Sequence, residues 1–179
     1  MRSVVGWIAA AFLSFAVAVP VAGAGEVSSA DVKKTIAAFE FKDPTMKARF
    51  KSAHGYVVFP TIGKGGLIVG GGAGDGQVFE RGRMIGTADV TQITVGLQAG
   101  VQEFSEVIFF QNKAALDRFT AGKFELSANA SAVVAKAGAS GGADYRDGVV
   151  VFTLAKEGVM LEAAVGGVGQ KVNFHPNLK

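Results

Sequence analysis

The pair Gly63-Lys64 is the first place in this 179-residue chain where residue types and spacing suggest chemistry. A glycine-rich loop that ends in Gly-Lys is the pattern that holds phosphate. That loop needs a glycine five residues before the pair's glycine and a serine or threonine after the lysine. The chain has Val58 and Gly65 at those positions, and it contains no G-x-G-x-x-G spacing. Both common nucleotide-binding loops are therefore excluded.

Two serines and two histidines are the remaining candidates for nucleophilic catalysis. Ser127 and Ser131 lack the Gly-x-Ser-x-Gly turn that exposes a catalytic serine, and no histidine lies near them in sequence. His54 and His175 are isolated, as surface or structural histidines are. Only a convergent polar cluster around one of them in a deep pocket would indicate an enzyme. We therefore predict a protein that is not an enzyme, with no catalytic residue and no cofactor.

The composition gives little support to thiol or metal chemistry. The chain has no cysteine and two histidines, so a thiolate nucleophile is excluded and a His-rich metal site cannot form. Two pairs of acidic residues lie close together in sequence and could act as paired carboxylates, but their ordinary interpretation is solvated surface charge. These are Glu103 with Glu106, and Asp144 with Asp147. We predict no metal site.

Basic residues are concentrated near the N-terminal end. The net charge of +3 is too small for general nucleic-acid binding. Residues 25–64, however, contain seven Lys and Arg against four acidic residues, while residues 65–179 contain ten against eleven. A basic amphipathic helix can lie in a membrane interface, and each cation near an anionic leaflet contributes about 1 kcal/mol. The candidate lipid-binding residues are Lys33, Lys34, Lys42, Lys47, Arg49, Lys51 and Lys64. The alternative is a helix pair that packs its apolar stripe on a sheet and leaves its lysines in water.

Two helical segments carry most of these basic residues. Ser28 offers a capping side chain, and apolar residues follow it at helical spacing: Val32, Ile36 and Phe39. Asp43-Pro44 restarts the pattern with a cap and a proline at the first helical position, and Gly55 ends the second helix. A third helix is predicted over 113–121.

The rest of the chain has the pattern of strands with glycine-rich turns. Lys64-Gly65-Gly66 and Arg81-Gly82-Arg83 are predicted turns, and the run 107–110 has the composition of a strand buried on both faces. Glycine at 70, 72, 74 and 76 leaves one strand face without side chains, which is typical of a bulge, a bend or the close approach of another surface. The predicted strands are 56–60, 66–72, 77–81, 84–90, 92–102, 104–110, 124–128, 130–137, 149–155, 158–165 and 168–174. We therefore predict an α+β fold with a strongly curved, antiparallel, barrel-like glycine-rich sheet, two N-terminal helices and one embedded helix.

The first 24 residues have the pattern of an export signal. Residues 4–19 are almost continuously apolar, and Ala22-Gly23-Ala24 has the small-x-small spacing that signal peptidase cleaves. The apolar run is shorter than the ~20 residues that a spanning helix needs. We expect cleavage near Ala24, a periplasmic location, and one domain over 25–179. The alternative is an uncleaved membrane anchor.

The stretch G-Y-V-V-F-P-x-x-G-K-G-G-x-x-V-G-G that begins at Gly55 resembles the SYLF domain, a family of lipid-binding modules. Three further segments fit the same family. They are TQITVGLQAG at 91–100, FFQNKAALDRF at 109–119 and DYRDGV at 144–149. The resemblance covers about residues 28–174.

This resemblance implies phospholipid binding through the N-terminal helical region. Phosphoinositides are the ligands of eukaryotic members, and yeast-type members also bind actin filaments. An exported protein meets neither, so in a Gram-negative envelope the ligands would be phosphatidylglycerol and cardiolipin. We expect a peripheral domain that binds anionic phospholipid membrane through residues 28–53, without nucleic acid and with no protein partner indicated. The alternative is an envelope structural or partner-binding module that uses the glycine-rich strands.

Overall fold

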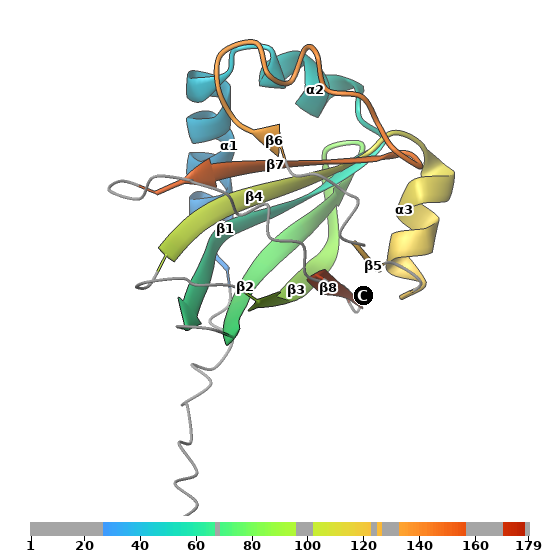
Figure 1. The fold of residues 1–179 in the computed structure, drawn as a ribbon. Helices are drawn as coiled ribbons and strands as arrows, with labels where there is room; N and C mark the ends of the chain where they lie inside the picture. The colour runs from blue at the N-terminus through green and yellow to red at the C-terminus, as the bar shows by residue number, and fades with distance from the viewer. Residues whose placement is uncertain are drawn as a thin grey trace, which may run out of the picture.

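The computed structural model describes residues 27–66, 69–95, 102–122, 125–126, 133–156 and 170–177. These residues form three helices and eight strands (Figure 1). The elements are α1 (Ser29–Lys42), α2 (Met46–Ser52), β1 (Gly55–Gly66), β2 (Val69–Glu80), β3 (Arg83–Val95), β4 (Gln102–Phe110), α3 (Lys113–Thr120), β5 (Glu125–Leu126), β6 (Val133–Val134), β7 (Val149–Ala155) and β8 (Gln170–Pro176). The predicted export signal, the strand predicted over 158–165 and most of that over 92–102 lie outside the described residues.

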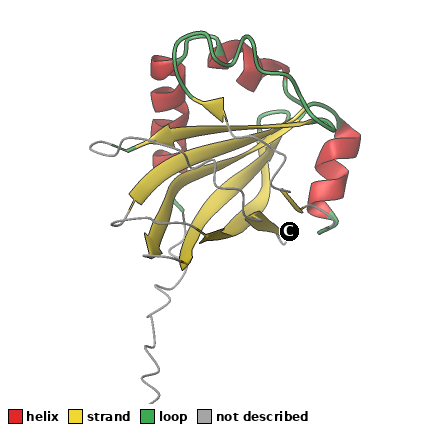
Figure 2. Cartoon of the chain, in the orientation of Figure 1, coloured by secondary structure: helices red, strands yellow, loops and turns green. Residues whose placement is uncertain are grey.

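All eight strands belong to one sheet in the order β5-β8-β3-β2-β1-β4-β7-β6. Every neighbouring pair is antiparallel except β6 with β7. Figure 2 shows a strongly twisted sheet with helices at its upper end and along its right side. The α+β class is therefore confirmed. In the part of the chain that the structure describes, the edge strands β5 and β6 do not pair with each other, so closure into a barrel is not confirmed.

The sheet separates two apolar cores, because successive side chains of a strand point to opposite faces. One face packs on α1 and α2, and we call its cluster the helix-pair core: Val32, Phe39, Met46, Ala53, Tyr56, Val58, Val107, Phe109, Ala135, Val150 and Phe152. The other face packs on α3, and we call its cluster the α3 core: Val57, Phe59, Ile62, Val78, Ala88, Val90, Phe104, Ile108, Phe110, Ala115, Leu116, Phe119, Val151 and Val172. Strands β1 and β4 contribute to both cores. This confirms that the run 107–110 is buried on both faces.

The predicted turn at Lys64-Gly65-Gly66 is wrong. These three residues lie in β1 and pair with Gly72, Gly71 and Gly70 of β2. Glycine is a turn signal only when no partner strand satisfies its backbone, and here two glycine-rich segments satisfy each other. For the same reason the two strands predicted over 66–72 and 77–81 are one continuous strand, β2. The turn at Arg81-Gly82 is confirmed, and both residues have positive φ.

Two glycines of β2 allow β1 to come unusually close. A methyl group at Gly76 would lie 2.5 Å from the carbonyl oxygen of Val58 and 2.7 Å from the ring of Phe59. At Gly74 it would collide with the carbonyl oxygen of Thr61. The register of β1 against β2 shifts between Val58 and Gly63, in the same stretch. Gly74 and Gly76 therefore make room for the irregular part of β1. Close approach of another surface is one of the arrangements that the glycine pattern predicted.

The starts of the two N-terminal helices show what local sequence can and cannot specify. The Ser28 hydroxyl accepts a hydrogen bond from the Asp31 N–H at 3.1 Å, which confirms the predicted cap of α1. The second helix begins at Met46 rather than at Pro44. Asp43 and Thr45 explain the delay, because the Thr45 N–H donates to Asp43 Oδ1 at 3.0 Å and makes the segment a turn.

Candidate functional site

Helix α1 carries two opposed stripes of side chains. The inward stripe has the spacing i, i+3, i+4, i+7 and consists of Val32, Thr35, Ile36 and Phe39, of which Ile36 is half-buried and the others are buried. The outward stripe repeats that spacing two residues later and consists of Lys34, Ala37, Ala38 and Phe41, all of them exposed. Two residues turn a helix by about 200°, so the stripes lie on nearly opposite faces. The apolar face that the sequence predicted is therefore the one that packs on the sheet.

Phe41 is the feature of this surface that sequence reasoning missed. Its side chain is 86% exposed, the highest value among the large apolar residues that the structure describes as exposed. The signal was present in the sequence, since Lys34, Ala37, Ala38 and Phe41 form a second set at helical spacing. The first set, which begins at Val32, is the more apolar and is sufficient to predict a helix. The second set holds only one large apolar residue, so its periodicity is the weaker signal.

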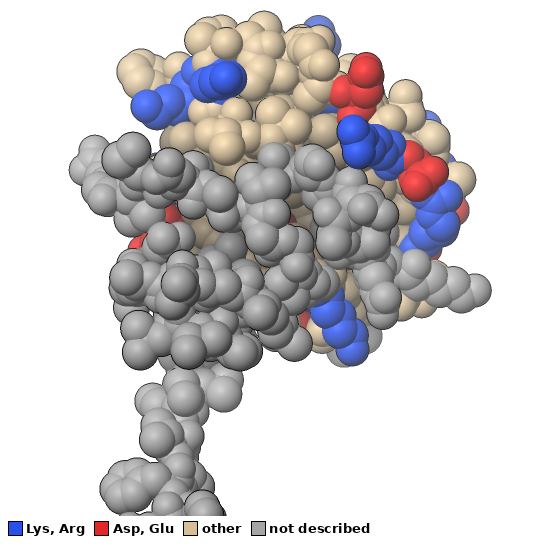
Figure 3. Space-filling model, viewed as in Figure 1, with Lys and Arg blue, Asp and Glu red and all other residues tan. Residues whose placement is uncertain are grey.

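Five of the seven candidate lipid-binding residues are exposed cations on α1 and α2. They are Lys33, Lys34, Lys42, Lys47 and Lys51. Among the acidic residues of this helix pair, Asp31 accepts a hydrogen bond from the Ser28 hydroxyl at 2.7 Å, Glu40 is half-buried and Asp43 is fully buried. In Figure 3, basic side chains at the upper left stand apart from acidic ones, whereas the two alternate along the right side, where α3 lies. All five of these exposed lysines therefore belong to the helix pair α1 and α2.

The other two candidates are placed differently. Lys64 lies in β1, apart from the helix pair, and its side chain is outside the described part of the molecule. Arg49 of α2 points inward. Its guanidinium donates to the carbonyl oxygens of Ser140 and Ala143, the latter at 2.7 Å, and lies 5.0 Å from the ring centroid of Tyr145. Because these contacts occupy the guanidinium, we assign Arg49 a structural role and leave it out of the lipid surface.

Asp43 is a buried anion that belongs to the same structural network. Its carboxylate accepts hydrogen bonds from the Thr45 hydroxyl at 2.6 Å and from the N–H groups of Ser140 at 2.6 Å, Thr45 at 3.0 Å and Gly138 at 3.1 Å. Burial alone raises the pKa of Asp43, but these hydrogen bonds outweigh burial and lower that pKa to about 2. Asp43 and Arg49 together fasten the segment around residues 138–145 to the helix pair.

The family-like segment 144–149 is held by local contacts. Tyr145 lies against Arg49. Asp147 and Gly148 both have positive φ, and Arg146 and Val149 exchange backbone hydrogen bonds at 2.9 Å. This segment therefore forms a tight turn that leads into β7.

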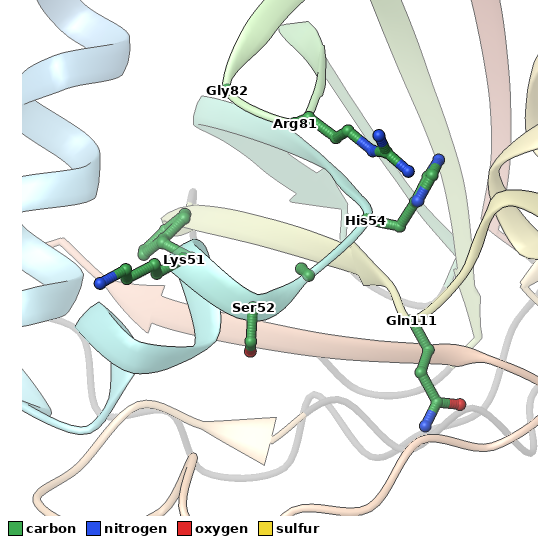
Figure 4. Close-up of a pocket in the computed structure, with 8 residues that line it drawn as sticks. Lys51, Ser52, His54, Arg81, Gly82 and Gln111 are labelled. Atoms are coloured by element: carbon green, nitrogen blue, oxygen red, sulfur yellow. The ribbon is translucent and has the colours of Figure 1, made fainter.

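A shallow polar cavity of about 390 Å³ lies beside α2. Its lining residues come from the end of α2, the β2–β3 turn and the segment after β4: Phe50, Lys51, Ser52, Ala53, His54, Arg81, Gly82 and Gln111. In Figure 4 the side chains of His54 and Arg81 lie side by side, but Lys51, Ser52 and Gln111 point elsewhere. An active site requires polar groups that converge on one point. The side chains around this cavity do not converge in that way.

Both histidines pair with carboxylates on the sheet. His54 Nε2 lies 2.9 Å from Glu80 Oε1, and His175 Nε2 lies 2.6 Å from Asp89 Oδ1. Asp75 is the direct cross-strand neighbour of Asp89. Burial and then the charge of Asp89 raise the pKa of Asp75, while His175 lowers it. Within the described ranges, no three His, Cys, Asp or Glu residues are grouped so that they could hold a metal ion.

Gly74 and Gly76 also bear on the alternative function, a partner-binding module that uses the glycine-rich strands. Val58, Thr61 and Phe59 of β1 already fill the space beside Gly74 and Gly76. That part of the glycine-rich face is therefore occupied by the protein itself. No helix among the described residues is long and apolar enough to cross a membrane.

The twisted sheet and its three helices define the class of protein as an α+β domain. Residues 91–175 match the family model Ysc84, described as "Las17-binding protein actin regulator". The resemblance to the SYLF family inferred from the sequence motifs is thereby confirmed. The family consists of lipid- and actin-binding modules. Helices α1 and α2 precede the matched segment.

One curated relative is similar to this chain. It is Beta cell expansion factor A of Aeromonas veronii, which is 28% identical over 128 residues. The aligned part covers 70% of this chain and 48% of the relative. The chain therefore spans about half the length of the curated relative that it matches.

Proposed function

We propose that this protein is an exported, non-enzymatic domain that binds anionic phospholipid at a membrane surface through the exposed lysines of α1 and α2. One observation carries the proposal: Lys33, Lys34, Lys42, Lys47 and Lys51 are exposed on one helix pair, while Arg49 and Asp43 are turned inward. The match of residues 91–175 to a family of lipid- and actin-binding modules supports it. Export rests on the sequence pattern of residues 1–24.

The magnitude of the electrostatic attraction is sufficient for peripheral binding. Each lysine near an anionic leaflet contributes about 1 kcal/mol, so five provide on the order of 5 kcal/mol when all reach the surface. This attraction is screened within about a Debye length, ~10 Å at 0.1 M salt. Binding should therefore depend on both lipid charge and ionic strength.

Vesicle co-sedimentation of the purified protein tests this proposal. We expect binding to phosphatidylcholine vesicles that contain phosphatidylglycerol or cardiolipin, weaker binding at high salt, and little binding to phosphatidylcholine alone. The double variant Lys34→Gln/Lys42→Gln should lose about 30-fold in affinity, because two such contacts are removed. Equal binding to neutral vesicles, or no binding to anionic ones, would exclude the electrostatic mechanism.

A matched control separates the helical surface from overall charge. Arg83 and Lys171 are also exposed cations, on β3 and β8 of the sheet. The variant Arg83→Gln/Lys171→Gln removes the same number of charges and should change affinity less than about twofold. Charges that lie farther from the membrane than the Debye length are largely screened by salt. Equal losses in the two variants would show that net charge, rather than the helix pair, determines binding.

A further inference from the structure

The inward stripe of α1 cannot reach a membrane while the domain is folded. Val32 is 1% exposed and Phe39 and Met46 are fully buried, all three within the helix-pair core. An interfacial helix normally inserts its apolar face. Here that insertion would require α1 to leave the sheet and expose the partners of this core, among them Val58 and Phe109. The outward stripe is the face that a docked α1 presents.

The outward stripe combines one large apolar side chain with small neighbours and flanking cations. Ala37 and Ala38 precede Phe41 by four and three residues, so their methyl groups are the ring's neighbours on the helix and leave it unobstructed. Lys34 lies one further turn back, and Lys42 follows Phe41 directly. An aromatic ring among exposed lysines is the arrangement that interfacial proteins use, with the ring at the headgroup boundary and the cations on phosphates.

We propose that α1 meets an anionic membrane while it remains docked on the sheet, and that the ring of Phe41 inserts between the headgroups as an apolar anchor. This inference rests on the proposed function and adds the orientation of the domain and the residue that enters the bilayer. The sequence alone favours the opposite face of α1, because the stripe that contains Phe39 is the more apolar of the two.

Charge complementarity selects a lipid surface over a second copy of this chain. A self-complementary contact centred on Phe41 would bring Lys34 and Lys42 of the two copies together, and like charges oppose such a contact. An anionic leaflet instead places phosphates around these lysines and hydrocarbon below the ring. Burial of a phenylalanine side chain then adds to the attraction of the cations.

Tryptophan fluorescence measures the depth of this position directly. The chain has one tryptophan, Trp7, so Phe41→Trp in a Trp7→Phe background carries a single indole at the proposed anchor. We expect a blue-shifted emission with phosphatidylglycerol vesicles and quenching by lipids brominated near the headgroup end of the acyl chain. The matched control is Ala114→Trp in the same background, at an exposed position of α3, whose emission should not change.

The outcomes distinguish this inference from the proposed function. Binding to anionic vesicles with no shift at position 41 would overturn the anchor and leave electrostatic binding intact, whereas loss of all vesicle binding would overturn both. An emission that shifts with protein concentration in the absence of vesicles would assign the face to a second copy and overturn the inference. Phe41→Ala should weaken vesicle binding about tenfold with little change in the thermal midpoint, because the Phe41 side chain is 86% exposed in the free protein. An unchanged affinity in that variant would contradict the anchor.

Discussion

Two charged side chains of the N-terminal region serve the fold rather than the surface. Asp43 accepts hydrogen bonds from Gly138 and Ser140, and Arg49 donates to Ser140 and Ala143. These partners are backbone groups of a loop more than ninety residues away in sequence. Because hydrogen bonds to a charged group are stronger than neutral ones, this pair of contacts holds the loop against the helix pair.

We expect Asp43→Asn to destabilise the fold at neutral pH. An amide in place of the carboxylate keeps one acceptor and leaves at least one buried N–H without a partner, so the free energy of unfolding at pH 7 should fall by about 1–3 kcal/mol. Urea denaturation monitored by circular dichroism measures this loss. Asp144→Asn is the control, because Asp144 is exposed in the same loop.

The same variant should change how stability depends on acid. The pKa of Asp43 in the fold, about 2, lies below the ordinary value of 3.8. A lowered pKa means that the ionised form stabilises the folded state above about pH 4, and that this contribution disappears as the pH falls toward about 2. The wild-type protein should lose this stability across that range, and Asp43→Asn should lose less. Parallel acid profiles for the two proteins would contradict the role of the charge.

Arg49 shows what a count of charges cannot predict. In the sequence it is one cation among six in residues 28–53, and nothing local separates it from Lys47 or Lys51. Its planar guanidinium fits two carbonyl oxygens and lies against two rings, Tyr145 and Phe152, which a lysine cannot do equally well. The tertiary partners decide which cation turns inward.

Among the elements, strands β1 and β2 depend on glycine for their packing. The register shift in β1 brings Val58 and Phe59 against Gly76 of β2. Glycine usually weakens a strand interior. Here it is required, because any Cβ at position 76 would meet a backbone carbonyl that cannot rotate away.

Gly76→Ala should therefore destabilise the protein while a neighbouring substitution does not. The added methyl group would lie 2.5 Å from the Val58 carbonyl oxygen, so the strands must separate, at a cost of about 1–3 kcal/mol. At Gly71 a methyl group would lie 3.9 Å from the nearest such atom, the carbonyl oxygen of Gln92. Gly71→Ala should change stability by less than about 0.5 kcal/mol. Thermal denaturation of both variants checks the difference, and equal midpoints would argue against close packing at Gly76.

At this scale the sequence predicted elements whose signals are local. The Ser28 cap, the start of the third helix at Lys113 and strand β7 over 149–155 are confirmed, because capping and apolar runs act within a few residues. The turn at Lys64 was wrong because strand pairing overrode a local glycine signal. The exposed face of α1 was missed for a related reason. Periodicity identifies an amphipathic helix, but only packing shows that the apolar stripe is already used.

At the scale of the whole molecule, strands β1 and β4 divide the fold into the helix-pair core and the α3 core. The two tyrosines of the chain both report on the helix-pair side. Tyr56 stacks on Phe79 with ring centroids 5.0 Å apart, and Tyr145 lies against the Arg49 guanidinium. Displacement of α1 and α2 from the sheet would therefore change the surroundings of both rings.

A surface that exists only in the folded protein has a consequence for its stability on membranes. A ligand that binds the folded state alone stabilises it by about 2.7 kcal/mol at a hundredfold excess over its Kd. Anionic vesicles should therefore raise the thermal midpoint of the Trp7→Phe protein and leave its near-ultraviolet tyrosine circular dichroism unchanged. If α1 instead left the sheet to insert its inward stripe, the helix-pair core would open. The tyrosine signal would then fall and the midpoint would decrease. Neutral vesicles are the control and should change neither quantity, so the sign of the midpoint shift separates docked binding from helix release.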